Sequence, residues 1–411
     1  MRAGLLGRKL GHSFSPRIHA FFGDYAYDLF EVEPEALDAF MKEGAFDALN
    51  VTIPYKKSVI PYCAELSESA RGIGSVNTLV RRADGTLFGD NTDAAGFSAM
   101  LQRLNVSAAG KKALVLGSGG ASLTVQHVLR AAGADPVIVV SRSGADNYEN
   151  LDRHADARIL VNTTPVGMYP RCGEAPLSLG HFPKLEAVLD VIYNPARTRL
   201  LQDAQARGIP CLGGLTMLVE QARAASERFT GASIPAARAD AVLSTLQRET
   251  QNIVLVGMPG CGKTTVGRLL AEKTGRRFVD TDDLIVERIG CSIPEYFAGH
   301  SEAEFRTVEA RAIADAGMQS GLVISTGGGC VTQEENYPSL HQNGAIFFLM
   351  RDLSLLPISG RPLSQRNSPE ALYAQRLPLY RRFADCEVEN MGAPEDAVAQ
   401  ILEAYDEISG C

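Results

Sequence analysis

Residues 257–265 read GMPGCGKTT and fit the phosphate-binding pattern G-x-x-x-x-G-K-[ST] at every fixed position. An apolar run from Asn252 to Val256 precedes this stretch and predicts a buried strand, and Val266 to Thr274 follows it with helical spacing. Backbone N–H groups in such a loop surround phosphate oxygens, the lysine neutralises their charge, and the next hydroxyl reaches Mg²⁺. The stretch therefore predicts a nucleoside triphosphate cradle made by Gly257, Gly260, Gly262, Lys263, Thr264 and Thr265, with Thr264 as a magnesium ligand. A glycine-rich turn without a ligand is the alternative.

The position of this loop divides the chain. A phosphate loop follows the first strand of its fold, so a domain is expected to begin near residue 251. The chain has 411 residues, too many for one ordinary core, and two or three domains are expected. With 45% hydrophobic residues, 21% charged residues and a net charge of -8, the composition is typical of a soluble globular protein. The acidic balance argues against nucleic acid as a partner.

Targeting signals and disulfide patterns are not found in the sequence. The N-terminal apolar run is too short for a signal peptide, and no segment approaches the ~20 apolar residues that span a bilayer, so we expect a cytoplasmic protein without a membrane partner. Eight cysteines are scattered without a Cys-x-x-Cys pair, which predicts reduced thiols. The sequence predicts no particular oligomeric state.

Residues 1–95 alternate strand-like and helix-like segments, the pattern of an α/β domain. Polar clusters interrupt this pattern at residues 12–16 (HSFSP), 50–56 (NVTIPYK) and 89–93 (GDNTD). Loops that follow strands often carry binding groups. Each cluster alone also fits a plain helix start, strand end or turn.

A second glycine-rich turn lies between an expected strand and an expected helix. Residues 111–122 read KKALVLGSGGAS, a helical segment follows to Ala132, and another strand is expected from Pro136 to Val140. In a βαβ unit such a turn directs helix N–H groups at a pyrophosphate, here through Gly117, Gly119, Gly120, Ala121 and Ser122. The second strand ends in Ser141, Arg142 and Ser143 rather than in Asp or Glu, which favours the 2′-phosphate of NADP over NAD. The alternative is that Arg142 is a solvated surface residue.

Taken together, the motifs before residue 249 resemble those of shikimate dehydrogenases. They occur in the family's order as Ser13-x-Ser15-Pro16, Asn50-Val51-Thr52-x-Pro54-x-Lys56, Ser75-Val76-Asn77-Thr78-Leu79, Gly89-x-Asn91-Thr92-Asp93, Gly117-x-Gly119-Gly120-Ala121 and Gly214-x-x-Met217-Leu218-Val219-x-Gln221-Ala222. The resemblance implies reversible reduction of 3-dehydroshikimate by NADPH, with Lys56 and Asp93 as the catalytic pair and Gly214 beside the cofactor. Around the substrate it implies Ser13, Ser15, Thr52, Asn77, Tyr193 and Gln221. The chain departs from the family at Ser141, Ser143 and Ala94, where Asn, Thr and Gly are usual.

The chain from residue 251 onward resembles shikimate kinases. The motifs that carry this resemblance are residues 280–282 (DTD), which are expected to end the second strand, 304–306 (EFR), 327–329 (GGG), 361–363 (RPL) and 376–381 (RLPLYR), in addition to the phosphate loop. The resemblance implies that Asp282, Arg306, Gly328 and Arg376 bind shikimate, with Asp282 oriented to the reacting hydroxyl. It also implies that Asp280 lies near magnesium and that Arg361 is a lid arginine, which acts with Lys263 on the transferred phosphoryl group of ATP.

The expected fold class is α/β throughout. We expect a substrate-binding domain over residues 1–95, completed by helices at about 220–248, a Rossmann NADP-binding domain over 96–219, and a P-loop domain like that of nucleoside monophosphate kinases over 251–411. The expected function is NADPH-dependent reduction of 3-dehydroshikimate to shikimate, followed by ATP-dependent phosphorylation to shikimate 3-phosphate, in aromatic amino acid biosynthesis. The alternatives are a quinate/shikimate dehydrogenase with relaxed cofactor use and a non-catalytic metabolite sensor.

Overall fold

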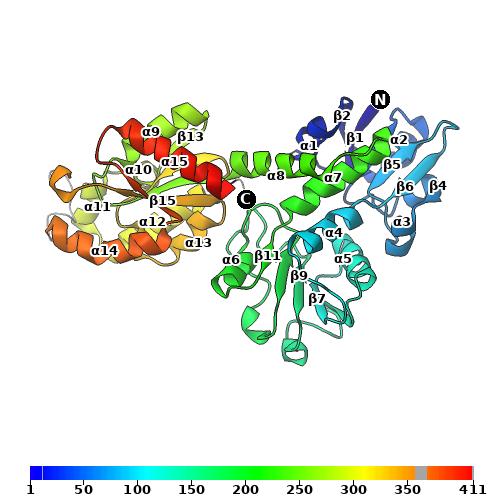
Figure 1. Ribbon diagram of the computed structural model, residues 1–411, viewed down its shortest axis with the longest axis horizontal. Helices are drawn as coiled ribbons and strands as arrows, with labels where there is room; N and C mark the ends of the chain where they lie inside the picture. The colour runs from blue at the N-terminus through cyan, green and yellow to red at the C-terminus, as the bar shows by residue number, and fades with distance from the viewer. Residues whose placement is uncertain (12, 357–367, 410–411) are drawn as a thin grey trace. The chain divides into compact units, whose positions relative to one another are not determined.

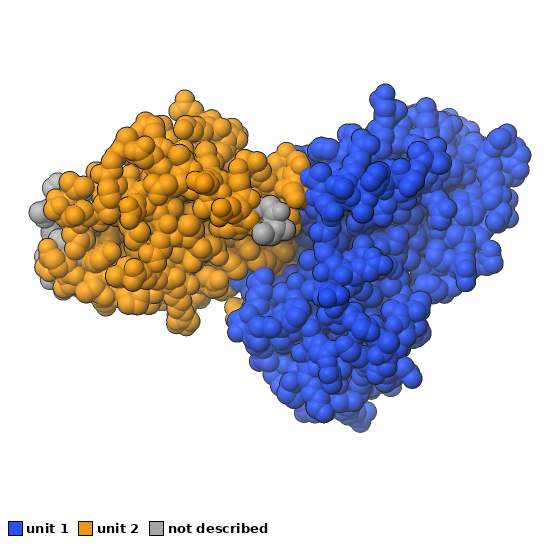
Figure 2. Space-filling view, viewed as in Figure 1, with its two compact units in different colours: residues 1–168, 174–194, 200–243 blue, residues 169–173, 195–199, 244–411 orange. Residues whose placement is uncertain are grey.

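A computed structural model describes residues 1–11, 13–356 and 368–409 of the chain (Figure 1). The chain divides into two compact units (Figure 2). Unit 1 comprises residues 1–168, 174–194 and 200–243, and unit 2 comprises residues 169–173, 195–199 and 244–411. Unit 1 holds two sheets and unit 2 holds one, and helices accompany all three, so the predicted α/β class is confirmed.

The first sheet of unit 1 has six strands in the order β2-β1-β3-β5-β6-β4 and mixes parallel and antiparallel pairs. Its strands are β1 (Arg2–Gly7), β2 (Ala26–Glu31), β3 (Ala48–Val51), β4 (Cys63–Leu66), β5 (Thr78–Arg81) and β6 (Leu87–Asp90). Its helices are α1 (Ser15–Phe22), α2 (Leu37–Glu43) and α3 (Glu68–Ile73), with short 3-10 turns η1 (Pro34–Ala36) and η2 (Ile60–Tyr62). Every residue of β3 is buried, as expected for a central strand covered on both faces. The loops after β3 and β6 are the polar clusters found in the sequence.

The second sheet of unit 1 is fully parallel, with the order β11-β10-β9-β7-β8. Its strands are β7 (Ala113–Leu116), β8 (Val137–Val140), β9 (Ile159–Asn162), β10 (Ala187–Asp190) and β11 (Cys211–Leu212). Its helices are α4 (Asp93–Arg103), α5 (Gly120–Ala131) and α6 (Arg199–Ala206), with turns η3 (Leu151–His154) and η4 (Leu179–His181). The direction of the strand order reverses between β7 and β9, and open α/β sheets bind ligands at such a point. Two longer helices follow, α7 (Leu215–Thr230) and α8 (Ala236–Thr250).

Unit 2 is built on a five-stranded parallel sheet with the order β13-β14-β12-β15-β16. Its strands are β12 (Asn252–Val256), β13 (Arg277–Asp280), β14 (Leu322–Ser325), β15 (Gly344–Met350) and β16 (Cys386–Glu389). Its helices are α9 (Lys263–Thr274), α10 (Thr281–Ile289), α11 (Ile293–Gly299), α12 (Glu302–Gly317), α13 (Asn336–His341), α14 (Pro369–Phe383) and α15 (Pro394–Ser409), with turns η5 (Cys330–Thr332) and η6 (Leu353–Leu355). The predicted strand, loop and helix order around the phosphate loop is confirmed in β12 and α9.

Two local details differ from the sequence-based expectation. Helix α9 begins at Lys263, earlier than the expected Val266, because Gly262 takes a left-handed conformation (φ 101°) directly before it. The segment that was expected to end a strand at Asp282 turns into helix α10 after Asp280. The Asp280 side chain caps that helix by accepting a hydrogen bond from the Asp282 N–H, so Asp282 lies in the first helical turn.

The boundary between the two units falls inside helix α8, at residue 243. The last turns of α8 are bonded into unit 2. The hydroxyl of Tyr405 donates to the carbonyls of Arg248 (2.5 Å) and Gln251 (3.0 Å), and the Gly321 N–H donates to the carbonyl of Thr250 (2.8 Å). Unit 2 thus begins before residue 251. Among the helices of the described residues, none is long and apolar enough to cross a lipid bilayer.

Candidate active sites

A cavity of about 560 Å³ lies within unit 1 and is lined by segments of both of its sheets. It gathers every predicted catalytic and substrate-binding residue of this half of the chain: Ser13, Ser15, Thr52, Lys56, Asn77, Asp93, Tyr193 and Gln221. Two residues predicted near the cofactor, Ala121 and Gly214, line the same cavity. Residues separated by more than 200 positions are therefore brought to one place, although their individual roles stay predictions.

Lys56 and Asp93 form an ion pair at this cavity. The Lys56 Nζ lies 2.5 Å from the Asp93 Oδ2, and the two side chains are 27% and 13% exposed. Lys56 is held in the turn after β3, where its carbonyl accepts a hydrogen bond from the Val76 N–H (2.8 Å). Asp93 is the first residue of α4, where the helix dipole favours a carboxylate. The pair presents an ammonium group that can exchange a proton with a bound carbonyl or hydroxyl oxygen.

Polar side chains around the cavity are fixed by neighbouring groups. Asn77 is buried, and its Oδ1 accepts a hydrogen bond from the Thr92 N–H (2.7 Å), which connects it to the segment before Asp93. Gln221 donates from Nε2 to the Leu218 carbonyl (3.0 Å). Tyr193 is 36% exposed, and partial removal from solvent raises the pKa of its hydroxyl group, which stays protonated as a hydrogen-bond donor. These groups suit a small polyhydroxylated ligand.

The turn between β7 and α5 fits a dinucleotide phosphate. Gly119 stands at the N-cap of α5, and apart from its own helix and its chain neighbours no atom of the described residues lies within 4 Å of where a Cβ would stand on Gly119 or Gly120. Space is therefore open beside the N-terminus of α5, where helix N–H groups can bind an anion. The hydroxyl of Ser122 differs, because it is fully buried and accepts a hydrogen bond from Gln126 (3.0 Å), so only its backbone can contribute.

The predicted reader of the 2′-phosphate lies at the end of β8. Arg142 is exposed and Ser141 is half-buried, directly after the last residue of that strand. The backbone N–H of Ser141 is bonded to the Asp146 carbonyl (3.1 Å), which folds the segment into a compact loop. An exposed guanidinium beside hydroxyl groups suits a phosphate, so the residues present fit NADP.

A second cavity, of about 580 Å³, lies within unit 2 beside the phosphate loop. The predicted residues that line it are Gly260, Gly262, Lys263, Thr264, Thr265, Asp280, Asp282, Arg306, Gly328 and Arg376. Gly257 lies at the base of the loop with φ 149°, where a Cβ would stand 2.6 Å from the Leu349 carbonyl oxygen. Arg361, the predicted lid arginine, lies outside the described residues.

The phosphate loop carries a buried cation and a pair of oxygen ligands. Lys263 is 7% exposed, and its Nζ donates to the carbonyls of Gly257 (2.9 Å) and Met258 (3.0 Å). The Thr264 hydroxyl donates to the Asp280 Oδ2 (3.0 Å), which places a hydroxyl and a carboxylate oxygen side by side. Mg²⁺ prefers such oxygen ligands beside nucleotide phosphates, so the residues present fit Mg²⁺ together with ATP.

The other end of this cavity holds two buried arginines. Arg306 lies on α12 and is ion-paired with Glu309 (2.6 Å) and Glu302 (3.0 Å). Arg376 lies on α14 and donates from Nη1 to the Gly328 carbonyl (3.0 Å). Two guanidinium groups a short distance from a phosphate cradle suit an anionic acceptor that carries a hydroxyl group.

Glu309 was missed in the sequence, although it lines the same cavity. Glu309 is 1% exposed, and burial raises the pKa of its carboxyl group even though the charge of Arg306 opposes this shift. The available signal was the spacing of Arg306 and Glu309, three residues apart on one helix, which puts the two side chains on one face. Many surface ion pairs share that spacing, so it did not identify a buried site.

Comparison with known proteins agrees with this geometry. The family model for the shikimate dehydrogenase substrate-binding domain matches residues 5–79, and the model for shikimate kinase matches residues 259–406. The NADP⁺-dependent shikimate dehydrogenase of Geobacillus kaustophilus is 37% identical over 255 residues, which is 56% of this chain and 92% of that protein. The corresponding protein of Methanopyrus kandleri is also 37% identical, over 56% of this chain and 91% of its own length.

Solved structures show the same relationship. A chorismate mutase/shikimate 5-dehydrogenase fusion protein from Clostridium acetobutylicum is 37% identical with a TM-score of 0.57, covering 60% of this chain and 96% of that one. The shikimate 5-dehydrogenase of Thermus thermophilus, solved with NADP(H) and shikimate, is 35% identical with a TM-score of 0.53 and covers 58% of this chain and 97% of its own.

Proposed function

We propose that the chain forms shikimate and then phosphorylates it. The premise is that the chain belongs to the shikimate dehydrogenase family and carries a shikimate kinase domain after the dehydrogenase part. The chain is an enzyme with an NADP-dependent oxidoreductase half and a kinase half that uses ATP and Mg²⁺. The first proposed reaction reduces 3-dehydroshikimate to shikimate, and the second transfers a phosphoryl group from ATP to the 3-hydroxyl of shikimate. The observation that carries the proposal is that each unit gathers its predicted catalytic and substrate-binding residues, as far as the structure describes them, around one cavity.

The oxidoreductase step depends on the Lys56–Asp93 pair. NADPH, when bound, supplies the hydride that adds to the carbonyl carbon of 3-dehydroshikimate. As negative charge develops on the carbonyl oxygen, Lys56 donates a proton from Nζ, and Asp93 keeps the ammonium group oriented toward that oxygen. Ser13, Ser15, Thr52, Asn77, Tyr193 and Gln221 hold the substrate carboxylate and hydroxyls. In the reverse direction Lys56 accepts the proton.

The kinase step depends on positioning and charge neutralisation. Arg306, Arg376 and Gly328 hold shikimate, and Asp282 orients its 3-hydroxyl toward the terminal phosphate of ATP. Lys263, which donates to the loop carbonyls, would turn to the phosphate oxygens and neutralise their charge, and Thr264 and Asp280 would hold Mg²⁺. The 3-hydroxyl oxygen attacks the phosphorus, ADP leaves, and the hydroxyl proton passes to Asp282 or to solvent. Arg361 acts on the transferred group.

We also propose that the domain limits follow the three sheets. The first sheet supports a substrate-binding domain over residues 1–95, completed by the helical residues at about 220–248, and the second supports an NADP-binding domain over 96–219. The third sheet supports the kinase domain, in which we include the end of α8.

The experiment that tests the proposal uses the full chain with two variants. Lys56→Ala is expected to abolish oxidation of shikimate by NADP⁺ and to spare ATP-dependent phosphorylation, whereas Lys263→Ala is expected to do the opposite. Thermal unfolding and circular dichroism check that each variant folds. If a folded variant lost both activities, the two sites would not be independent, and if the wild-type chain turned over neither substrate, the sensor alternative would stand.

The substrate alternatives are separated in the same assay. Rates with shikimate or quinate, each with NADP⁺ or NAD⁺, give four values of kcat/KM. The proposal expects shikimate with NADP⁺ to be the preferred pair, because Arg142 follows β8 where an acidic residue would favour NAD. A higher kcat/KM with quinate would favour a quinate/shikimate dehydrogenase instead.

A further inference from the structure

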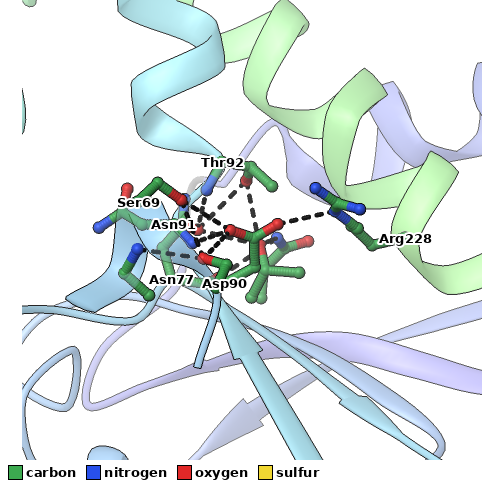
Figure 3. A network of polar contacts seen from close by, with 10 residues as sticks. Ser69, Asn77, Asp90, Asn91, Thr92 and Arg228 are labelled. Carbon is green, nitrogen blue, oxygen red and sulfur yellow. Dashed lines mark hydrogen bonds and ion pairs between the residues drawn. The ribbon is translucent and has the colours of Figure 1, made fainter. Parts of the chain in front are cut away.

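Asp90 is a buried carboxylate at the end of β6 with donors on both of its oxygens (Figure 3). Its Oδ1 accepts hydrogen bonds from the hydroxyls of Ser67 (2.5 Å) and Ser69 (2.9 Å) and from the Asn91 N–H (2.7 Å). Its Oδ2 accepts a hydrogen bond from the Arg228 Nε (2.7 Å), and the Asp90 side chain is only 5% exposed. Burial alone would raise the pKa of Asp90, but these hydrogen bonds and the charge of Arg228 lower it below its ordinary value. The carboxylate is therefore held in its ionised form.

The residues that follow Asp90 run directly into the dehydrogenase site. The Asn91 Nδ2 donates to the carbonyl (3.0 Å) and the hydroxyl (2.9 Å) of Ser75, and the Thr92 N–H donates to the Asn77 Oδ1 (2.7 Å). Asp93 comes next and pairs with Lys56. Hydrogen bonds of Asn91, Thr92 and Asp93 thus hold the whole of the short segment that joins Asp90 to the ion pair with Lys56.

The partner of Asp90 on the other side lies on the helix that carries Gln221. Arg228 and Gln221 are both on α7, seven residues or about two turns apart, which places them on the same face of the helix. Figure 3 shows Arg228 projecting from α7 toward the Asp90 carboxylate. The N-terminal part of α7 is held separately, where it packs on Gly96 of α4. The Asp90–Arg228 pair is thus a second attachment of α7 to the segment that carries Asp93.

We propose that Asp90 is a positioning residue of the dehydrogenase site, which holds the segment Asn91–Asp93 and the Gln221 helix in one fixed arrangement around the substrate. The proposal rests on the proposed dehydrogenase function. Asp90 does not line the cavity, so it acts through Asp93 and Gln221 and touches no substrate itself. Its effect is expected mainly in the affinity for shikimate, because Gln221 and Asn77 are substrate-binding residues in the proposal.

Three substitutions test the Asp90–Arg228 attachment separately from the overall fold. Asp90→Asn keeps an oxygen that accepts the bonds from Ser67, Ser69 and Asn91, but it turns an amide donor toward the Arg228 donor. Arg228→Met removes the cation from a side chain that is 56% exposed and leaves the other bonds of Asp90 in place. Arg228→Lys keeps a cation near Asp90. The matched control is Asp28→Asn, which breaks the exposed Arg2–Asp28 pair (3.1 Å) elsewhere on the first sheet.

The experiment measures KM and kcat for shikimate oxidation by NADP⁺ in the full chain, with the Kd of NADPH as a readout of folding in unit 1. We expect Asp90→Asn and Arg228→Met each to raise KM about tenfold with a smaller change in kcat, and the double variant to add little to either. Arg228→Lys is expected to recover most of the affinity. The Kd of NADPH and all constants of Asp28→Asn are expected to stay within about twofold of wild type.

Unchanged KM values in both variants, or losses that simply multiply in the double variant, would overturn the positioning role. An equal loss of NADPH affinity would show that Asp90 only maintains the fold. If Asp90→Asn does not fold, Arg228→Met and Arg228→Lys decide the question alone. Failure of the wild-type chain to oxidise shikimate would instead overturn the proposed function, and the two failures are therefore distinguishable.

Discussion

Replacing Gly96 with alanine tests how closely the two helices beneath the dehydrogenase cavity must approach. A Cβ on Gly96 would stand 2.5 Å from the Met217 carbonyl oxygen and 3.2 Å from the Gln221 Cβ. Real Cβ atoms essentially never lie under 3.0 Å from a neighbour, and ordinary contact begins at 3.4 Å. In Gly96→Ala, α4 and α7 must therefore separate by about 0.5–0.9 Å, the difference between those limits and 2.5 Å. Asp93 lies on α4 and Gln221 on α7, so the separation acts directly on the proposed site.

Gly96→Ala changes the free energy of unfolding in two opposite ways, through a gain in helix propensity and a loss from overpacking. Only the overpacking acts on catalysis. Alanine is favoured over glycine in a helix interior by about 1 kcal/mol, and overpacking a close contact costs about 1–3 kcal/mol. The net loss in the free energy of unfolding is then about 0–2 kcal/mol. A misplacement of 1 Å lowers activity by as much as ~10²-fold, so a shift of about 0.5–0.9 Å is expected to lower kcat/KM by roughly 10- to 60-fold.

The assay follows NADPH formation from shikimate and NADP⁺, with urea unfolding measured in parallel. Ala99→Gly in the same helix is the matched control, because it changes helix propensity without adding an atom at the contact. It is expected to lose about 1 kcal/mol of stability and to keep kcat/KM unchanged. Kinase activity should be unaffected in both variants. A Gly96→Ala protein that is more stable than wild type, with kcat/KM within twofold, would refute the reasoning.

Three further predictions concern the cofactor site, the phosphate loop and pH. Arg142→Ala is expected to raise the KM for NADP⁺ by about 10- to 100-fold and to leave the KM for NAD⁺ nearly unchanged, and equal losses for both in steady-state kinetics would contradict it. Asn390 donates from Nδ2 to the Cys261 carbonyl (2.7 Å) in the phosphate loop, so Asn390→Ala is expected to weaken ATP binding about fivefold by calorimetry, and unchanged affinity would argue against this support. The pKa of Asp90 lies below its ordinary 3.8, so its bonds contribute stability that is present above that value and is lost as the pH falls through the native pKa. Arg228 is the charge that faces Asp90. In Asp90→Asn the free energy of unfolding is expected to fall less steeply with decreasing pH below about pH 4 than in the wild type, and an unchanged slope would contradict this.

The parts of the fold that the sequence predicted well are those fixed by neighbouring residues. The phosphate loop could be identified because its glycines, Lys263 and Thr264 are contiguous, and β12 and α9 adjoin it. The pairing of Lys56 with Asp93 was implied only by the family resemblance, since 37 positions separate the two residues. Asp282 was expected at a strand end but lies in the first turn of α10. Its place depends on the Asp280 side chain, which caps that helix, and a strand pattern in the sequence does not reveal such a cap.

Other features depend on contacts that no local pattern contains. Arg228 and Asp90 are 138 positions apart, and nothing near either residue in the chain indicates the other. Glu309 has the spacing of an ordinary surface ion pair with Arg306, and only the packing around α12 buries it. Single-sequence reasoning therefore found the residues with a recognised motif and missed those whose importance comes from tertiary burial.

The end of helix α8 has a practical consequence for anyone who wants the kinase as a separate recombinant fragment. Tyr405 is 1% exposed, and cutting before residue 251 would remove the Arg248 carbonyl, the nearer of the two carbonyls that accept its hydroxyl, and would leave that of Gln251. The same cut would remove the Thr250 carbonyl that accepts the Gly321 N–H. A typical intramolecular hydrogen bond contributes about 0.5–1.5 kcal/mol, so the loss of these two bonds is enough to lower the yield of a marginally stable fragment. Fragments intended for crystallisation or inhibitor screening should therefore begin at or before residue 244.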